Sequence, residues 1–197
     1  MTDDPTLRFY ADNAATYAEH VTTPTGPRLS AFLARVPAGG KILELGCGNG
    51  RDAAHMLSLG FDVEATDGTP ELAAEAERRI GRPVRILRFE QLDADAAYDG
   101  IWACASLLHA PAADLVDILG RIHRALRPGG VFTASFKAGS GEGHDGLGRY
   151  FNYPSAERLR ADYAAAGWAD IVLETQMGTG YDAQPTAWLW VTARRSP

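Results

Sequence analysis

Short apolar runs alternate along most of the chain with segments of helical periodicity. Strands are predicted at residues 41–46, 61–67, 84–89, 100–106 and 131–136, where apolar runs end in turn residues. Helices are predicted between them at residues 51–59, 70–80 and 115–126, where apolar side chains recur every three or four positions. This alternation predicts parallel βαβ units, with helices on both faces of one sheet.

The pattern changes after residue 137. A polar, glycine-rich segment, 138–154, precedes a helix predicted near 155–166. Two strands follow, near 169–176 and 187–194, and we expect them to form an antiparallel hairpin because no helical pattern separates them. The prediction is a doubly wound α/β fold whose mostly parallel, seven-stranded sheet ends in this C-terminal hairpin. Residues 6–20 and 26–36 are predicted helices, so residues 1–36 are expected to form a cap.

Length and composition favour one domain over residues 1–197. The formal net charge of −6 argues against a nucleic-acid partner, because phosphates repel an acidic surface. The apolar runs are shorter than the ~20 residues that cross a bilayer, and the polar N-terminus does not resemble a secretory signal. Cys47 and Cys104 form no CxxC pair, so neither a disulfide framework nor a metal site is predicted. We therefore expect a cytoplasmic enzyme or binding protein, with its oligomeric state left open.

A glycine loop, LELGCGNG at 43–50, follows the first predicted strand. Gly46 and Gly48 lack a β-carbon, so the backbone can turn tightly there and approach a ligand. Ligands of open α/β sheets bind beyond the carboxyl ends of the strands. Asp67 ends the second strand, where a carboxylate can accept hydrogen bonds from ribose hydroxyls. The loop and Asp67 together predict a nucleotide site.

The loop favours an adenosine ligand without pyrophosphate. A dinucleotide fingerprint, GxGxxG/A, needs a third small residue, but counting from Gly46 that position is Arg51. The loop also lacks the GK[ST] ending of a P-loop. An NAD-dependent oxidoreductase is thus a weaker alternative.

Four segments resemble successive motifs of class I S-adenosylmethionine-dependent methyltransferases. They are ELGCGNGRD (44–52), ATDGTPELAAEA (65–76), YDGIWACASLLH (98–109) and LRPGGVFTASFK (126–137). The resemblance extends from about Phe9 to Arg194 and is strongest to small bacterial enzymes of the tellurite-resistance and quinone-biosynthesis types. It implies S-adenosylmethionine as cofactor.

The resemblance also implies roles for individual residues. Asp67 would hold the ribose, and Glu44 would either orient the loop or approach the cofactor's amino group. Arg88 departs from the acidic residue that is common at the end of the third strand, so the adenine contact falls to Glu90 or Phe89. Cys104 would pass beneath the sulfonium as a small wall residue. The implied cofactor-binding set is Tyr10, Glu44, Gly46, Cys47, Gly48, Asn49, Arg51, Asp67, Gly68, Thr69, Phe89, Glu90 and Cys104.

His109 is the catalytic candidate on the acceptor side. It follows the fourth strand, and its ordinary pKa suits proton transfer near neutrality. The alternative is a histidine that braces a loop or caps a helix, and methyl transfer to a good nucleophile needs no base. Tyr10 and Tyr17 would either form a flap over the cofactor or pack a helix.

The segment 138–154 is interpreted as a lid or acceptor loop, or else as a solvated connection. Arg149, Tyr150 and Tyr153 would bind the acceptor, with Arg149 suited to an anion. The function expected is methyl transfer to a small-molecule acceptor. A non-catalytic protein that binds the cofactor is the alternative.

Overall fold

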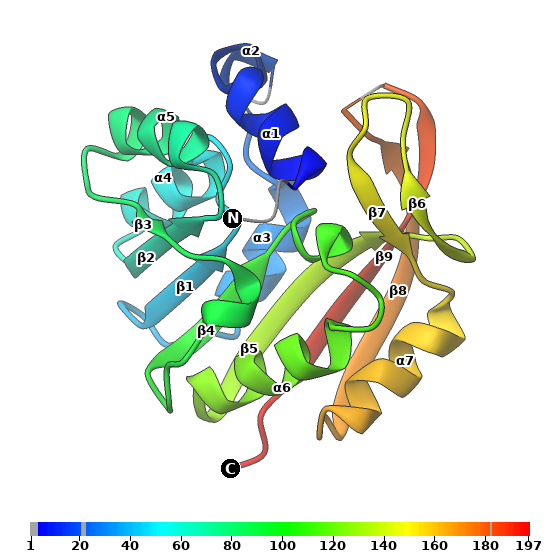
Figure 1. Ribbon diagram of the computed structural model, residues 1–197. Helices are drawn as coiled ribbons and strands as arrows, with labels where there is room; N and C mark the ends of the chain where they lie inside the picture. The colour runs from blue at the N-terminus through cyan, green and yellow to red at the C-terminus, as the bar shows by residue number, and fades with distance from the viewer. Residues whose placement is uncertain (1–3, 21–22, 182) are drawn as a thin grey trace.

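The computed structural model describes residues 4–20, 23–181 and 183–197. Its central sheet has seven strands in the order β3-β2-β1-β4-β5-β9-β8 (Figure 1). The first five in chain order pair in parallel, and β8 and β9 close the sheet as an antiparallel pair. The strands are β1 (Lys41–Leu45), β2 (Asp62–Asp67), β3 (Arg85–Ile86), β4 (Tyr98–Ala103), β5 (Leu126–Lys137), β8 (Asp170–Thr179) and β9 (Pro185–Arg194). This topology confirms the predicted fold class, including the C-terminal hairpin.

Helices cover both faces of the sheet (Figure 1). They are α3 (Gly26–Leu33), α4 (Arg51–Ser58) and α5 (Pro70–Ile80) on one face, and α6 (Leu115–Ala125) and α7 (Ala156–Ala165) on the other. The apolar stripe of α6 is buried on the sheet through Leu115, Ile118, Leu119 and Ile122. On the opposite face Phe32 of α3 packs 5.2 Å from the Trp102 ring, between ring centroids. Two cores therefore flank the sheet and fix the ends of its strands.

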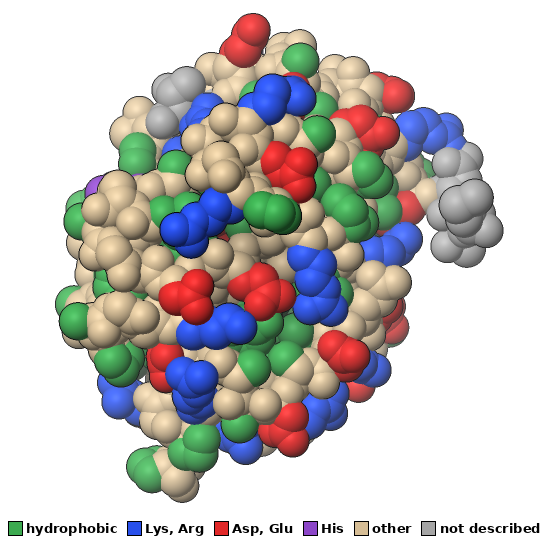
Figure 2. All heavy atoms as spheres, turned by 90° about the vertical axis from the view of Figure 1, so that its left-hand side faces the viewer, with side chains coloured by type: hydrophobic (Ala, Val, Ile, Leu, Met, Phe, Trp, Pro, Cys, Tyr) green, Lys and Arg blue, Asp and Glu red, His purple; other side chains and the backbone are tan. Residues whose placement is uncertain are grey.

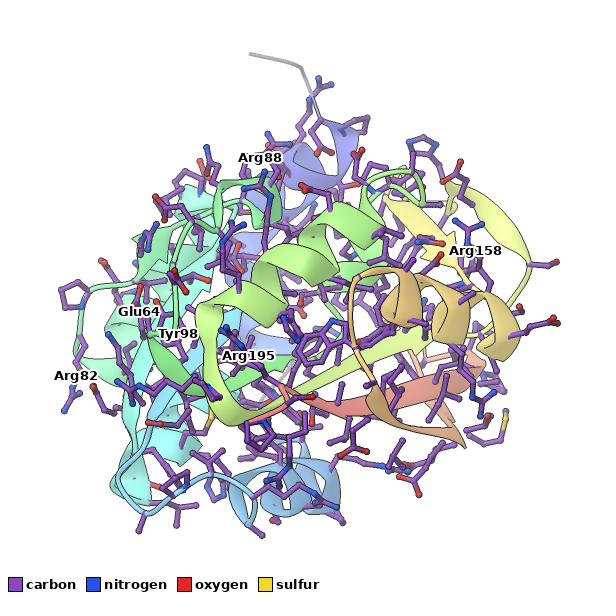
Figure 3. The ribbon with its side chains drawn as sticks, turned by 90° about the horizontal axis from the view of Figure 1, so that it is seen from below. Glu64, Arg82, Arg88, Tyr98, Arg158 and Arg195 are labelled. Atoms are coloured by element: carbon purple, nitrogen blue, oxygen red, sulfur yellow. The ribbon has the colours of Figure 1, made fainter. Side chains whose placement is uncertain are left out.

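The edges of the sheet away from the cavity are held by specific polar contacts. Tyr98 of β4 donates a 2.9 Å hydrogen bond to Glu64 of β2, and the two side chains point toward each other in the view from below (Figure 3). Arg195, after β9, donates to the carbonyl of Arg124 at 2.8 Å and so satisfies an acceptor in the last turn of α6. These contacts tie the start of β4 and the C-terminal segment to the rest of the fold.

Two predicted elements have the wrong extent. The strand expected at 84–89 is only two residues long, because the chain leaves the sheet edge after pairing with Thr66 and Asp67 and forms a 3₁₀ turn, Phe89–Gln91. The helix expected at 6–20 is broken into α1 (Pro5–Asp12) and α2 (Ala14–His20). The side-chain amide of Asn13 donates to the carbonyl of Phe9 at 2.8 Å, and such local bonding competes with helix continuation.

The glycine-rich segment is ordered into a second, two-stranded sheet. Its strands are β6 (Gly141–His144) and β7 (Tyr150–Tyr153), and they pair antiparallel. Asp145 organises the turn, since its carboxylate accepts from the backbone N–H groups of Leu147 and Arg149 at 3.0 and 2.9 Å. The segment interpreted as a lid or acceptor loop, 138–154, therefore contains a β-hairpin.

Acidic and basic side chains are interspersed on the face that carries β3 and its neighbours (Figure 2). Arg85 pairs there with Glu64 at 3.3 Å, and Arg78 pairs with Glu75. None of the helices in the described part of the chain is long and apolar enough to cross a membrane.

Candidate active site

A cavity of about 930 Å³ opens at the carboxyl ends of the parallel strands. Its lining comes from the loops after β1, β2 and β4, from α1 and α2, from the β6–β7 hairpin and from the β8–β9 pair. Figure 1 shows α1 and α2 above the sheet, with the β6–β7 hairpin standing beside them. Parallel strands end at one edge, so residues far apart in the sequence converge there.

The glycine loop after β1 depends on missing β-carbons for packing. Gly46, Gly48 and Gly50 have φ values of 73°, 57° and 74°, a region that L-residues rarely adopt. A β-carbon at Gly46 would lie 2.5 Å from the Ser106 Cβ, and one at Gly50 would lie 3.0 Å from the Ala76 Cβ of α5. Gly50 thus allows close packing of α5. In a dinucleotide fingerprint the third small residue serves such packing, and it would stand at position 51.

Asp67 braces the loop from the end of β2. Its carboxylate accepts hydrogen bonds from the backbone N–H groups of Gly48 and Thr69, both at 2.9 Å. Burial raises its pKa to about 6. A carboxylate has about four acceptor sites, so Asp67 retains capacity for ligand hydroxyls.

Glu44 is a buried carboxyl on the cavity wall. The backbone N–H of Ala53 donates to it, whereas its Oε2 has no hydrogen-bond partner among the described residues. Burial raises its pKa well above the usual range, and Asp52 and Asp67 add to that effect. A buried, unpartnered carboxyl oxygen fits a cationic ligand group such as an ammonium, because it would supply the missing partner.

Arg51 and Asp52 join the start of α4 to the segment before α3. Asp52 accepts from the Thr25 hydroxyl at 2.6 Å, from Arg51 Nε at 2.8 Å and from the Trp102 indole at 3.0 Å. Sequence reasoning missed Thr25 and Asp52, since their 27-residue separation leaves no local pattern. The Arg51 charge is therefore already paired at the cavity wall.

The side chains of His109 and Tyr10 meet in the cavity wall. The Tyr10 hydroxyl lies 2.9 Å from His109 Nε2, and His109 Nδ1 lies 2.6 Å from the carbonyl oxygen of Tyr150. Burial lowers the pKa of His109 to about 4 and raises that of Tyr10 to about 12, so both groups are neutral near pH 7. Tyr10, predicted to lie against the cofactor, lines the cavity and contacts His109 there.

Arg149 is enclosed rather than presented to the cavity. Its side chain is 2% exposed and donates to Asp145 at 2.9 Å from Nε and 2.7 Å from Nη2. Its guanidinium carbon lies 4.9 to 5.9 Å from four ring centroids, those of Phe9, Tyr10, Phe151 and Tyr181. This arrangement argues against the expectation that Arg149 pairs with an anionic acceptor.

The other two predicted acceptor residues differ in placement. Tyr150 lines the cavity, and its hydroxyl donates to Glu142 while its backbone N–H donates to the Thr6 hydroxyl at 2.9 Å. Tyr153 is not among the residues of the cavity wall and instead stacks on Phe151, with ring centroids 5.5 Å apart. Tyr153 thus lies outside this wall, and its role in acceptor binding stays a prediction.

Comparison with known proteins identifies the family. The family described as "Methyltransferase domain" matches residues 42–130. The 27-O-demethylrifamycin SV methyltransferase of Amycolatopsis mediterranei is 32% identical over 164 residues, which are 78% of this chain and 54% of that protein. The ubiquinone biosynthesis O-methyltransferase of Xanthomonas axonopodis pv. citri is 34% identical over 124 residues, 59% of this chain and 50% of that protein. The chain thus spans about half the length of these curated relatives.

A solved structure agrees over nearly the whole chain. The Burkholderia thailandensis 1,6-didemethyltoxoflavin-N1-methyltransferase, with bound 1,6-didemethyltoxoflavin and S-adenosylhomocysteine, has a TM-score of 0.75 and 27% identity. The match covers 97% of this chain and 88% of that one. The chain belongs to the class I S-adenosylmethionine-dependent methyltransferases.

The remaining residues that the methyltransferase motifs implied also border the cavity. Gly68, Thr69, Phe89 and Glu90 lie along its wall. Glu90 is exposed and pairs with Arg88 at 2.8 Å. Asn49 binds the carbonyl of Ala18 in α2 at 3.0 Å, which ties the glycine loop to the N-terminal helices.

The two cysteines of the cavity wall have neutral thiols. Cys104 lies 3.6 Å from the Thr25 hydroxyl, and burial raises its pKa to about 11. Cys47 is buried in the glycine loop, where burial raises its pKa as well. Neither has the lowered pKa of a nucleophilic thiol. The described residues hold no group of three or more His, Cys, Asp or Glu side chains that could bind a metal.

The β8–β9 pair contributes a further wall of the cavity, which was not predicted from the sequence. Trp188 and Trp190 line the cavity from β9, and Tyr181 lines it from beyond the end of β8. The Tyr181 ring stacks on Tyr17 with centroids 5.5 Å apart and an interplanar angle of 23°. Tryptophans two apart on a strand next to β5 were an available signal, because they share one face.

Proposed function

We propose that the chain transfers a methyl group from S-adenosylmethionine to a small-molecule acceptor. The observation that carries the proposal is one continuous cavity with two chemically different ends. The glycine loop, Asp67 and the unpartnered Glu44 oxygen form one end, and His109, Tyr10 and the β9 tryptophans border the other. Membership of the family supports the cofactor, and the small-molecule ligand of the Burkholderia neighbour supports the kind of acceptor.

The residues at the first end fit the parts of the cofactor. Glu44 would accept from its ammonium group and Asp67 from its ribose hydroxyls. Gly46, Cys47 and Gly48 would run along its methionine part, with Asn49 and Arg51 holding the loop in shape. The adenine would lie among Gly68, Thr69, Phe89 and Glu90, and Cys104 would lie beneath the sulfonium.

The cofactor supplies an electrophilic methyl group on a positively charged sulfur. The chain's own contribution is to hold the acceptor in line with that methyl and to exclude water, and such positioning can supply ~7–11 kcal/mol of a barrier. The cap within 1–36 and the lid of 138–154 stay part of this proposal, although residues 1–3 and 21–22 of the cap lie outside the described residues. The net charge of −6 favours a small acceptor over a nucleic acid.

Calorimetric titration with S-adenosylhomocysteine and NAD tests the cofactor. We expect S-adenosylhomocysteine alone to bind, and Asp67→Ala to weaken binding by ~1–3 kcal/mol because charge-assisted hydrogen bonds are lost. Incubation with S-adenosylmethionine and a metabolite panel, with release of S-adenosylhomocysteine as readout, tests transfer. Heat with NAD and none with S-adenosylhomocysteine would contradict the proposal.

A further inference from the structure

Tyr10 and His109 form a hydrogen-bonded couple on the acceptor side of the cavity. They come from α1 and from the 3₁₀ turn after β4, 99 positions apart, and both line the cavity. The turn directly follows Cys104, Ala105 and Ser106, the segment proposed to pass beneath the sulfonium. The couple therefore borders the place where the acceptor would meet the methyl group.

The hydrogen bonds assign the protons of the couple. The Tyr150 carbonyl oxygen can only accept, so His109 Nδ1 carries the hydrogen of the 2.6 Å bond. In the neutral imidazole Nε2 is then a bare acceptor, and the Tyr10 hydroxyl donates to it over 2.9 Å. The imidazole is held in the tautomer that can receive a proton from the phenol.

Arg149 completes the environment of the phenol. Its guanidinium carbon lies 5.9 Å from the centroid of the Tyr10 ring, and its positive charge favours a phenolate there. The Tyr10 oxygen donates to His109 and keeps a lone pair. That lone pair can accept a hydrogen from an O–H or N–H group in the cavity.

We propose that Tyr10 and His109 are a proton relay that deprotonates an uncharged acceptor with a weakly acidic O–H or N–H group. The inference rests on the proposed methyl transfer and specifies its acceptor class. The cations of the cavity wall support an uncharged acceptor, since each already has a partner. Arg149, Arg51, Arg28 and Arg88 pair with Asp145, Asp52, Glu174 and Glu90, and Lys137 lies 4.4 Å from the centroid of the Phe151 ring.

The relay balances atoms and charges. The acceptor's O–H or N–H bond breaks, and its electron pair forms the bond to the methyl carbon while the methyl–sulfur bond breaks toward sulfur. The released proton binds the Tyr10 oxygen as the phenol's own hydrogen moves to His109 Nε2. One positive charge disappears at sulfur and one appears on the imidazole, so the charge of the closed site is unchanged. The imidazolium then returns its proton to water.

Two conservative variants separate the relay from packing. Tyr10→Phe removes the hydroxyl, and His109→Gln can keep a hydrogen-bond acceptor but cannot take a proton. Tyr98→Phe and His55→Gln are matched controls, because Tyr98 lies at the start of β4 and His55 on α4, both outside the cavity wall. Each full-length protein is assayed with S-adenosylmethionine and phenol, 4-cyanophenol, 4-nitrophenol or benzimidazole, and with benzoate and selenite as anionic probes.

We expect turnover of at least one phenol or N–H heterocycle by the wild type. Tyr10→Phe and His109→Gln should lower kcat by ~10²–10⁴-fold for the least acidic acceptor, the range of a positioned base. The loss should shrink toward 4-nitrophenol, which ionises in mildly alkaline buffer without help. The Kd for S-adenosylhomocysteine should stay within about twofold of the wild-type value, because positioning of the cofactor does not depend on the relay.

Three results would overturn the relay. They are an equal loss of kcat for every acceptor whatever its acidity, turnover confined to benzoate or selenite, and no turnover of any neutral acceptor by a wild type that binds S-adenosylhomocysteine. Failure of the wild type to bind S-adenosylhomocysteine would overturn the proposed function, and the relay with it.

Discussion

Asp67 and Glu44, two buried carboxyl groups at the cofactor end of the cavity, differ in their hydrogen-bond partners and therefore in their pKa values. Asp67 accepts from two backbone N–H groups, and burial raises its pKa only to about 6. Glu44 keeps one oxygen without a partner, and its pKa rises well above the usual range. At pH 7 Asp67 is mainly a carboxylate, whereas burial without a partner shifts Glu44 toward its protonated form, and a bound cation would oppose that shift.

At a pH below the raised pKa of Glu44, binding of S-adenosylhomocysteine should release a proton from this carboxyl. The ligand's ammonium favours the charged carboxylate, so the pKa of Glu44 falls from its raised value on binding and the proton leaves. The calorimetric binding enthalpy should therefore vary with the ionisation enthalpy of the buffer. Glu44→Gln should abolish that dependence, while Glu64→Gln, at the opposite end of the sheet, should retain it. The same buffer dependence in Glu44→Gln would contradict the role of Glu44.

At the scale of elements, Arg149 joins the covers of the cavity. It extends from the β6–β7 hairpin and reaches rings from α1, from β7 and from Tyr181 beyond β8. The Tyr150 N–H bond to the Thr6 hydroxyl and the Tyr10–His109 couple cross the same junction. A hairpin rich in glycine is thereby held closed over the site.

Arg149→Ala should destabilise the fold by ~3 kcal/mol, because it leaves the Asp145 carboxylate without its partner in a partly buried place. Arg121→Ala is the matched control, since Arg121 pairs with Asp117 on α6, whose carboxylate is 68% exposed. That exposed pair should contribute less than ~1 kcal/mol. Denaturant unfolding measures both, and hydrogen exchange over 139–153 should speed up only in Arg149→Ala. Equal losses of unfolding free energy in the two variants would show that Arg149 does not hold the covers of the cavity together.

The whole molecule is organised around one cavity. Its wall includes Tyr10 of α1 and Trp190 of β9, so elements near both ends of the chain contribute. Leu87 after β3 and Lys137 at the end of β5 line it from the two edges of the parallel part of the sheet. The strands of the sheet connect these contributions through continuous pairing from β3 to β8. A ligand in the cavity should therefore stabilise the fold as one unit.

S-adenosylhomocysteine at a hundred times its Kd should stabilise the native state by ~2.7 kcal/mol. Thermal unfolding should remain a single transition, and its Tm should rise with ligand concentration. The same concentration of NAD should leave the Tm unchanged. A rise in Tm with NAD, or a second unfolding transition whose Tm does not change with ligand, would contradict a single cooperative unit built on the S-adenosylmethionine site.

The sequence by itself determined the α/β alternation, the glycine loop after β1 and Asp67 at the end of β2. These features are local, because strand and helix periods and the conformational freedom of glycine are read within a few residues. The sequence also indicates the family, because the motifs that resemble class I methyltransferases lie in those same loops.

Which side chains contact one another follows only from the tertiary structure. The 99 positions between Tyr10 and His109, and the distance in the chain from Arg149 to Phe9, carry no periodic signal. Arg149 is ion-paired rather than open to an acceptor because the turn of its hairpin brings Asp145 against it. Tyr153 lies at the far end of β7 and stacks on Phe151, outside the cavity wall. Such contacts form only when the sheet brings distant elements to one edge, and that convergence is a property of the fold.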